Sequence, residues 1–348
     1  MKTLTLTRPD DWHLHVRNNA ILKTVLPHTA KQFARAIIMP NLKPPVTTVE
    51  QALTYREEIL QAIPDSKNFT PLMTLYLTAA TPLSEIKKAA ASAHVYAFKL
   101  YPAGATTNSD AGVSDIKAIY PLLAELEKQD IPLLIHGEVT REDCDIFDRE
   151  REFVDTSLTQ ITTNFPGLRI VLEHLTTSEA VDFVQASGKN IAATITPQHL
   201  LYNRNAILAG GIRPHYYCLP ILKRERHRLA LVAAATSGNP KFFLGTDSAP
   251  HLTSLKETTC GCAGCFSAHA AIELYAEAFE QAGALDKLEG FASFYGADFY
   301  RLPRNTNTIT LKKESWTVPL SYGADETRIT PLKAGEELTW KLQQSIKK

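Results

Sequence analysis

The sequence predicts an α/β fold, a (β/α)₈ TIM barrel with short flanking strands at the C-terminal end. Short apolar runs alternate with amphipathic segments along most of the 348 residues. The runs are almost continuously apolar, as in parallel strands that are buried on both faces. No linker or low-complexity stretch interrupts the alternation before about residue 300. A doubly wound open sheet remains the alternative, because periodicity alone does not distinguish it from a closed barrel.

Eight apolar runs are expected to form the strands. In chain order they are 3–7, 36–39, 72–77, 95–100, 132–136, 169–174, 191–195 and 242–247. Segments of helical period lie between them, for example 48–62, 114–129, 177–187 and 224–237. Thr48 and the pair Ser114-Asp115 are residues typical of helix N-termini, so two of these helices are expected to begin there.

The chain is expected to form one domain over residues 1–348, with the barrel core at about 3–300. The remaining segment, about 303–348, contains the strand-like runs 309–311 and 316–318. These runs are too short to build a core of their own, so we expect them to flank the barrel rather than form a second domain.

Composition excludes several classes of protein. Lys+Arg and Asp+Glu both number 37, so charge gives no reason to expect binding to nucleic acid or to an anionic membrane. The N-terminus lacks a secretory signal pattern, and no apolar segment is long enough to span a bilayer. Five cysteines, an odd number, argue against a disulfide framework. We therefore expect a cytoplasmic protein.

The first motif with chemical content is His13-Leu14-His15. Side chains two residues apart on an extended strand point to the same side, so these imidazoles can aim at one metal ion. Four further candidate ligands lie at the ends of later predicted strands: Lys99, His136, His174 and Asp247. The carboxyl ends of the strands form the rim where barrel enzymes carry their active sites. The pattern therefore indicates a metal site at that rim.

Lys99 is the unusual member of this set. An ammonium group repels metal ions, and its burial in an apolar strand is unfavourable. Burial lowers the pKa of a lysine, and a neutral amine reacts with carbon dioxide to form an anionic carbamate. Such a carbamate has two oxygens and can bridge two divalent ions. The alternative is a lysine that pairs with a carboxylate at the rim.

The ligand set resembles that of the binuclear branch of the amidohydrolase superfamily. Seven longer stretches closely resemble the dihydroorotases of de novo pyrimidine synthesis, of the compact bacterial type. They are 9–15, 39–48, 99–102, 136–140, 195–200, 217–223 and 245–251. The resemblance runs in collinear order from about residue 5 to about 300 and is weakest beyond 303.

The resemblance implies reversible conversion of N-carbamoyl-L-aspartate to dihydroorotate and water. It implies that His13, His15 and Asp247 hold one zinc ion, and that His136 and His174 hold another. Lys99, as N6-carboxylysine, and a hydroxide would bridge the two ions. Two such ions supply a nucleophile and a Lewis acid together. Asp247 would act as the general base and acid.

The resemblance also implies a substrate-binding set. An arginine can hold a carboxylate with two hydrogen bonds, which suits Arg17. The full set implied for substrate contact is His15, Arg17, Asn41, His136, Leu219, His251 and Ala263, with Leu219 and Ala263 acting through their backbones. The loop 102–112 is small and polar, and it is expected to form a lid that carries Thr106 and Thr107.

Alternatives remain open at this stage. A hydantoinase, an allantoinase or a mononuclear deaminase could use the same scaffold, although Lys99 disfavours a deaminase. An inactive barrel that serves in an assembly is a third possibility, and the intact ligand set argues against it. Cysteines could form a further metal site or a packed thiol loop, of which we favour the loop: Cys218, Cys260, Cys262 and Cys265. The resemblance suggests a homodimer acting on a small molecule.

Overall fold

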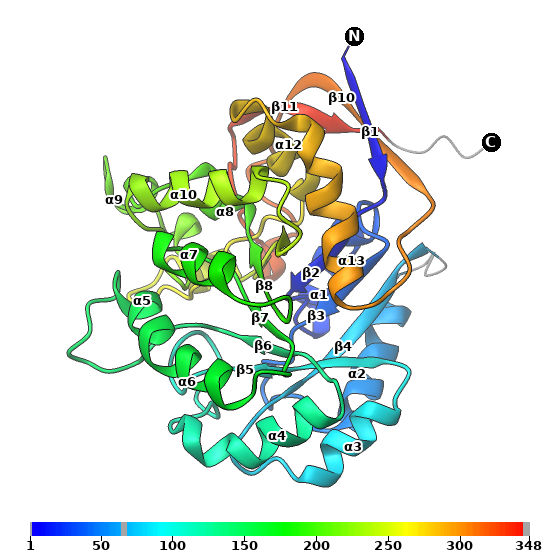
Figure 1. The fold of residues 1–348 in the computed structure, drawn as a ribbon. Helices are drawn as coiled ribbons and strands as arrows, with labels where there is room; N and C mark the ends of the chain where they lie inside the picture. Colours follow the sequence, from blue (N-terminus) through cyan, green and yellow to red (C-terminus); the bar gives the residue numbers. More distant parts are fainter. Residues whose placement is uncertain (1, 64–67, 344–348) are drawn as a thin grey trace.

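The computed structural model describes residues 2–63 and 68–343 and confirms the barrel. Eight parallel strands lie side by side in chain order (Figure 1). They are β2 (Asp10–Leu14), β3 (Arg35–Ile38), β4 (Thr70–Tyr76), β5 (Val95–Leu100), β6 (Leu133–Ile135), β7 (Ile170–Leu172), β8 (Ile191–Ile195) and β9 (Phe242–Leu244). Each strand pairs with the next in parallel register, as consecutive βαβ units require.

The first and last strands close the barrel through the residues that carry the candidate ligands. The amide of Asp247 donates to the carbonyl of His13 at 2.9 Å, and the amide of His15 donates to the carbonyl of Ser248 at 3.1 Å. Leu14 and Ser248 form a parallel bridge at the same point. Closure of the barrel therefore brings two distant parts of the sequence to one place at the rim.

One expected strand was assigned wrongly. Residues 3–7 form β1 (Thr3–Thr7), which is not a barrel strand but pairs antiparallel with the C-terminal β10 (Thr308–Thr317). Thr3 and Thr5 are exposed, Leu4 is half-buried and Leu6 is buried, an alternation typical of a strand with one face in solvent. The true first strand of the barrel is β2, whose five residues are all buried. Its polar residues do not match the apolar pattern by which the other strands were predicted.

Helices cover the outside of the barrel (Figure 1). They are α1 (Asn19–Ala30), α2 (Val49–Gln61), α3 (Leu83–Ala91), α4 (Tyr120–Lys128), α5 (Arg149–Phe153), α6 (Thr159–Asn164), α7 (Ser178–Ala186), α8 (Pro197–Leu201), α9 (Asn205–Leu208), α10 (Glu225–Thr236), α11 (Thr253–Lys256), α12 (Ala271–Gln281) and α13 (Tyr295–Phe299). The expected start at Thr48 is confirmed, because its side chain forms a capping box with Gln51. The expected helix 114–129 divides into a 3₁₀ turn over Ile116–Ile119 and then α4.

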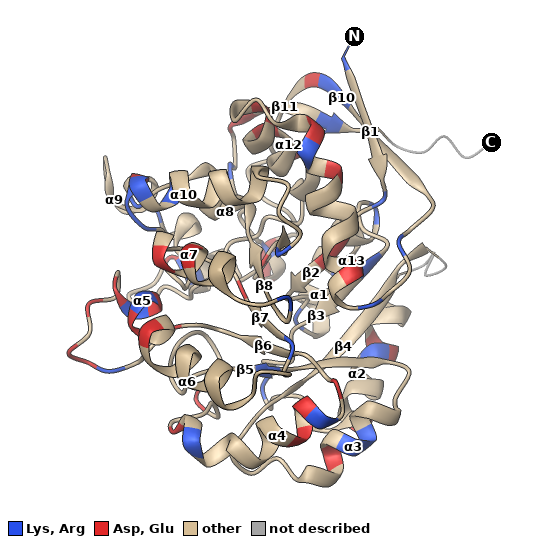
Figure 2. Ribbon diagram, in the orientation of Figure 1, with Lys and Arg blue, Asp and Glu red and all other residues tan. Residues whose placement is uncertain are grey.

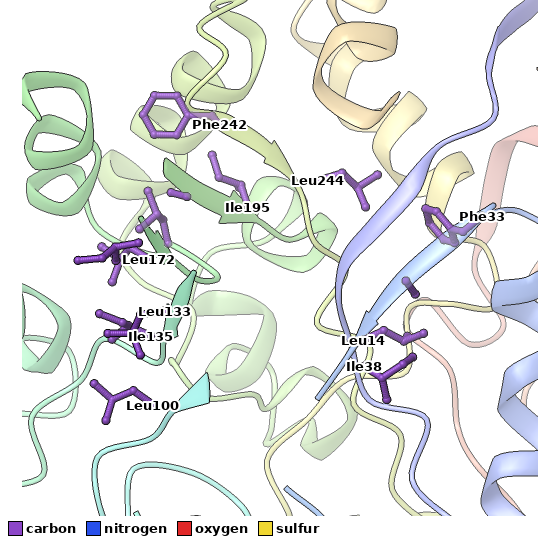
Figure 3. Close-up of a cluster of buried hydrophobic side chains, with 14 of the residues drawn as sticks. Leu14, Phe33, Ile38, Leu100, Leu133, Ile135, Leu172, Ile195, Phe242 and Leu244 are labelled. Carbon is purple, nitrogen blue, oxygen red and sulfur yellow. The ribbon is translucent and has the colours of Figure 1, made fainter. Parts of the chain in front are cut away.

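Alternate residues of the strands fill two separate spaces. Outward side chains pack between the sheet and the helices, as the residues labelled in Figure 3 show. Inward side chains form a compact plug inside the barrel, which includes Ala97, Leu134 and Val171. Trp12 and Tyr300 stack in this plug with ring centroids 4.5 Å apart. The next inward layer toward the carboxyl ends of the strands is polar, and it forms the floor of the site.

The C-terminal segment flanks the barrel, as expected, up to residue 343. β10 and β11 (Glu337–Leu342) form a three-stranded antiparallel sheet with β1 in the order β1-β10-β11, and this sheet lies beside α12 (Figure 1). Figure 2 shows basic and acidic residues interspersed on outer helices such as α3 and α4. Within the described residues, no helix has both the length and the apolar character needed to cross a membrane.

Candidate active site

Three of the expected metal ligands converge at the closure of the barrel. His13 Nε2 and His15 Nε2 lie 3.1 Å apart, and Asp247 Oδ1 lies 3.3 Å from the first nitrogen and 3.2 Å from the second. Ligand atoms bound at about 2.0–2.1 Å around a tetrahedral ion are separated by about 3.3 Å. The three atoms therefore already have the spacing that a metal such as zinc requires.

The side chain of Asn41 fixes the orientation of one of these imidazoles. His15 Nδ1 donates to Asn41 Oδ1 at 2.9 Å, which leaves Nε2 with its lone pair facing the ligand cluster. A hydrogen bond to the second ring nitrogen commonly sets the tautomer of a metal-binding histidine in this way. The donor set therefore fits a metal ion in orientation as well as in spacing.

Strand register explains why further ligands point inward. Each occupies a position two residues beyond a member of the apolar plug, and side chains two apart on a strand share a face. The pairs are Ala97 with Lys99, Leu134 with His136, and Val171 with Glu173. The polar layer is thus a direct continuation of the barrel core.

The second cluster includes a residue that sequence reasoning missed. His13, Glu173 and His174 present one ligand atom each within 4.8 Å of one another, and all three are buried. Glu173 Oε1 lies 3.0 Å from His13 Nδ1, and its other oxygen accepts a hydrogen bond from Lys99 Nζ. The signal in the sequence was the carboxylate directly before His174, in a strand that is otherwise apolar.

His136 is close to this cluster but has a different partner. Its Nε2 lies 2.7 Å from Glu138 Oε2, and its ring centroid lies 4.7 Å from that of His174. The structure therefore brings His136 and His174 side by side without placing His136 in either three-ligand group. The Nδ1 of His174 is buried and has no hydrogen-bond partner among the described residues.

Burial and charge together perturb the titration of the cluster. Burial lowers the pKa of His15 to about 4 and holds that of His174 well below its usual value, so both are neutral donors at pH 7. Burial alone would also lower the pKa of His13, but Glu173 and Asp247 outweigh it and raise the pKa to about 9. The two carboxylates therefore require positive charge at this point, which a metal ion would supply.

Three residues of the site have a left-handed backbone conformation. Arg17, His174 and Asp247 have positive φ values of 59°, 46° and 41°. Residues with a Cβ are uncommon in this region and persist where the surrounding structure enforces it, often at functional sites. Each of the three follows a barrel strand at the rim.

The expected substrate residues line one cavity beside the ligands. The residues that line it are His13, His15, Arg17, Asn41, Tyr101, Thr106, Thr107, His136, His174, Leu219, Asp247, Ala249, Ala263 and Gly264. Every expected contact residue except His251 is in this set. His251 lies behind Arg17, because its Nε2 is 3.0 Å from Arg17 Nη2 and 2.9 Å from the carbonyl oxygen of Ala263.

The loop 102–112 forms hydrogen bonds with two other segments that line the cavity. Thr107 Oγ1 donates to the carbonyl of Ala263 at 3.4 Å, and the carbonyl of Thr107 accepts from Asn41 Nδ2 at 3.1 Å. Asn108 Nδ2 donates to the carbonyl of Asn41 at 3.0 Å. The loop thus contributes Thr106 and Thr107 to the lining of the cavity, and its action as a lid stays a prediction.

Two further buried polar residues stabilise the walls of the cavity. They were not predicted from the sequence. Asp11 accepts hydrogen bonds from the amides of His13 and Thr246 at 3.1 and 2.9 Å, which ties β2 to the segment after β9. Lys256 Nζ donates to the carbonyls of Tyr217, Cys262 and Gly264 at 2.8, 2.9 and 2.7 Å. Neither residue lies in a motif that identifies its partners, and Thr246 and Tyr217 are distant from them in sequence.

The cysteines lie beside this wall. Cys218 and Cys265 are buried, Cys262 is half-buried and Cys260 is exposed. The metal-type groups of three that the described residues offer contain only histidine, aspartate and glutamate.

Comparisons with known proteins show which family and which structures this chain is similar to. Residues 9–338 match the model of the amidohydrolase family. A dihydroorotase from Acaryochloris marina is 65% identical over 342 residues, which cover 98% of this chain and 99% of that protein. The crystal structure of a dihydroorotase from Campylobacter jejuni has a TM-score of 0.90 at 36% identity, covering 98% of this chain and 97% of that chain. A dihydroorotase from Saccharomyces cerevisiae, in complex with 5-fluoroorotic acid, has a TM-score of 0.90 at 32% identity and 99% coverage of both chains.

Proposed function

Because the chain belongs to the amidohydrolase family and its full-length relatives are dihydroorotases, we propose that its rim site performs the dihydroorotase reaction. This reaction is the reversible cyclisation of N-carbamoyl-L-aspartate to dihydroorotate, a step of pyrimidine biosynthesis. The observation that carries the proposal is the convergence of His13, His15 and Asp247 in one cavity with Arg17 and Asn41. The cavity thus combines metal ligands with groups that suit an acidic substrate.

Dihydroorotases of this family are metal-dependent, and the donor set here fits metal ions. In the proposed arrangement His13, His15 and Asp247 would hold one zinc ion, and His136 and His174 would hold a second. Carboxylated Lys99 would be a further ligand. Bound there, the two ions would polarise the scissile carbonyl and lower the pKa of a water molecule.

Lys99 is suited to carboxylation by its surroundings. Its side chain is fully buried, and burial lowers the pKa of its amino group, although the neighbouring Glu173 opposes this. In its neutral form the amine attacks carbon dioxide, forms an N–C bond and releases one proton. The product is an anion beside a second anion, Glu173, so the modification requires cations in the same cluster.

Asp247 is the proposed proton carrier. Its carboxylate faces the cavity and is anionic, because the charge of His13 holds its pKa well below the usual range against the effect of burial. It accepts a proton from the attacking water and delivers that proton to the ring nitrogen as the amide bond breaks. In the biosynthetic direction it removes a proton from the carbamoyl nitrogen and helps to release water.

The other cavity residues bind and orient the substrate. Arg17 and Asn41 hold the substrate carboxylate, and the backbones of Leu219 and Ala263 contact the ring. His251, which the resemblance implies as a further carboxylate contact, lies outside the cavity lining and contacts Arg17. Thr106 and Thr107 close over it. A neutral ring such as hydantoin lacks the carboxylate, so this arrangement favours dihydroorotate over the substrates of a hydantoinase or allantoinase.

A direct assay tests the proposal. Purified protein is expected to hydrolyse dihydroorotate and to cyclise N-carbamoyl-L-aspartate, with about two zinc ions per chain by elemental analysis. Chelation of the metal should abolish both directions. Faster turnover of hydantoin than of dihydroorotate would contradict the assignment.

The resemblance also supports a homodimer in the cytoplasm. Light scattering should then give about twice the 38.5 kDa mass of one chain. A mass of 38.5 kDa at assay concentrations would contradict the dimer without affecting the proposed reaction.

A further inference from the structure

Tyr101 lines the cavity, and the proposed reaction gives it no role. It follows β5 and stands two residues after Lys99, so strand geometry directs both side chains to the interior of the barrel. It lines the cavity together with Arg17, His136 and Asp247. Only 1% of the residue is exposed.

The hydroxyl of Tyr101 is an unused donor. It is buried and has no hydrogen-bond partner among the residues that the structure describes. A buried hydroxyl without a partner is unfavourable in a folded protein, so each such group calls for a specific explanation. In a cavity wall, the simplest explanation is an acceptor that arrives with the ligand.

The ring itself is held firmly by its neighbours. Tyr76 stacks on it with centroids 5.0 Å apart and planes at 30°, and Lys99 Nζ lies 4.6 Å from the ring centroid. These contacts hold the ring in one place in the cavity wall, to which Arg17 and Asp247 also belong.

We propose that the Tyr101 hydroxyl donates a hydrogen bond to an oxygen of the substrate in the closed site. This inference rests on the proposed function, which supplies a ligand with carboxylate and carbonyl oxygens. Both forms of the substrate present only acceptors at these oxygens, and a phenol is a single, rigidly placed donor. Tyr101 thereby becomes a catalytic residue in addition to those implied by the family resemblance.

Tyr76 provides a matched control. Its hydroxyl is also buried and without a partner among the described residues, and its ring stacks on that of Tyr101. It is not among the residues that line the cavity. Tyr76→Phe therefore removes the same chemical group from the same packing environment but not from the site.

The experiment compares Tyr101→Phe and Tyr76→Phe with the parent enzyme in dihydroorotate hydrolysis, with metal content and thermal unfolding measured on the same samples. For Tyr101→Phe we expect kcat/KM to fall about 10- to 100-fold, as for the loss of one hydrogen bond to a polar or charged group. Its metal content should be unchanged and its Tm without ligand should not fall, since no protein partner is lost and an unpartnered buried hydroxyl is removed. The rise in Tm on adding dihydroorotate should be smaller than in the parent.

Two results would overturn the inference. One is a kcat/KM within twofold of the parent for Tyr101→Phe. The other is an equal loss in Tyr101→Phe and Tyr76→Phe, which would assign the effect to packing. A fall confined to kcat would place the hydrogen bond at the reacting carbonyl, and a rise confined to KM would place it at the carboxylate. A parent enzyme without dihydroorotase activity would contradict the proposed function itself.

Discussion

Replacement of Arg17 by methionine should separate substrate binding from metal binding. The guanidinium group has five N–H donors. In the structure Nε donates to the carbonyl of Pro250 at 3.1 Å, Nη2 lies 3.0 Å from His251 Nε2, and Nη1 lies 3.5 Å from His15 Nδ1. The remaining donors are free to hold a carboxylate with two hydrogen bonds. Methionine keeps most of the apolar stem and removes all of the donors.

The magnitude follows from the bonds lost. One charge-assisted hydrogen bond contributes about 1.5–3 kcal/mol, so two bonds to the carboxylate should contribute at least about 3 kcal/mol. That free energy corresponds to a rise of about 10²-fold in KM for dihydroorotate. The carboxylate does not react, so its binding is similar in the ground state and the transition state, and kcat should change less than tenfold.

Steady-state hydrolysis of dihydroorotate measures both constants, and elemental analysis of the same sample measures zinc. Arg169→Met is a suitable control, because Arg169 is comparably buried but pairs with Asp130 before β7, outside the cavity. Arg169→Met should have a lower free energy of unfolding than the parent but the same KM for dihydroorotate. If Arg17→Met retained the parent KM, the carboxylate would be held elsewhere and the proposed orientation of the substrate would be wrong.

Two other predictions concern lysines. Lys99→Ala should lose zinc and activity together, and short carboxylic acids should restore part of both; full zinc loading with near-normal turnover would refute the bridging role. Lys256→Met should raise KM by roughly tenfold, since three backbone hydrogen bonds that hold the cavity wall are lost. Lys241→Met, which also removes hydrogen bonds to three carbonyls but far from the cavity, should lower Tm without changing KM. An equal KM in the two variants would leave Lys256 without a role in binding.

The local pattern of apolar residues was sufficient to predict most of the barrel. Seven of the eight barrel strands were expected close to their observed positions, because a strand buried on both faces is apolar throughout. The prediction of the first strand failed because that strand is polar. The run 3–7 is the more apolar in appearance, yet β2, with Asp10, Asp11 and His13, is the one that is fully buried. Its polar groups are satisfied by partners at the far end of the sequence, such as Thr246.

The site was predictable to the extent that its residues occur in motifs. His13, His15 and Asp247 were expected from their positions at strand ends, and the structure brings their ligand atoms together. Glu173 was not expected, because its role depends on contacts with Lys99 and His13 on other strands. Lys256 was not expected, because its partners are backbone carbonyls, which no residue type identifies.

Asp247 is the residue that we propose to carry the proton in the dihydroorotase reaction at this rim. The most direct test is Asp247→Asn, whose amide oxygen can still bind a metal ion weakly but cannot accept the proton. With zinc content measured on the same sample, we expect kcat for dihydroorotate hydrolysis to fall by at least the ~10²-fold typical of a positioned general base, with substrate affinity within about tenfold. The acid limb of the pH–rate profile of the parent should be absent from that of Asp247→Asn. A zinc-loaded Asp247→Asn enzyme with parental kcat and an unchanged acid limb would contradict the account and leave Asp247 as a metal ligand only.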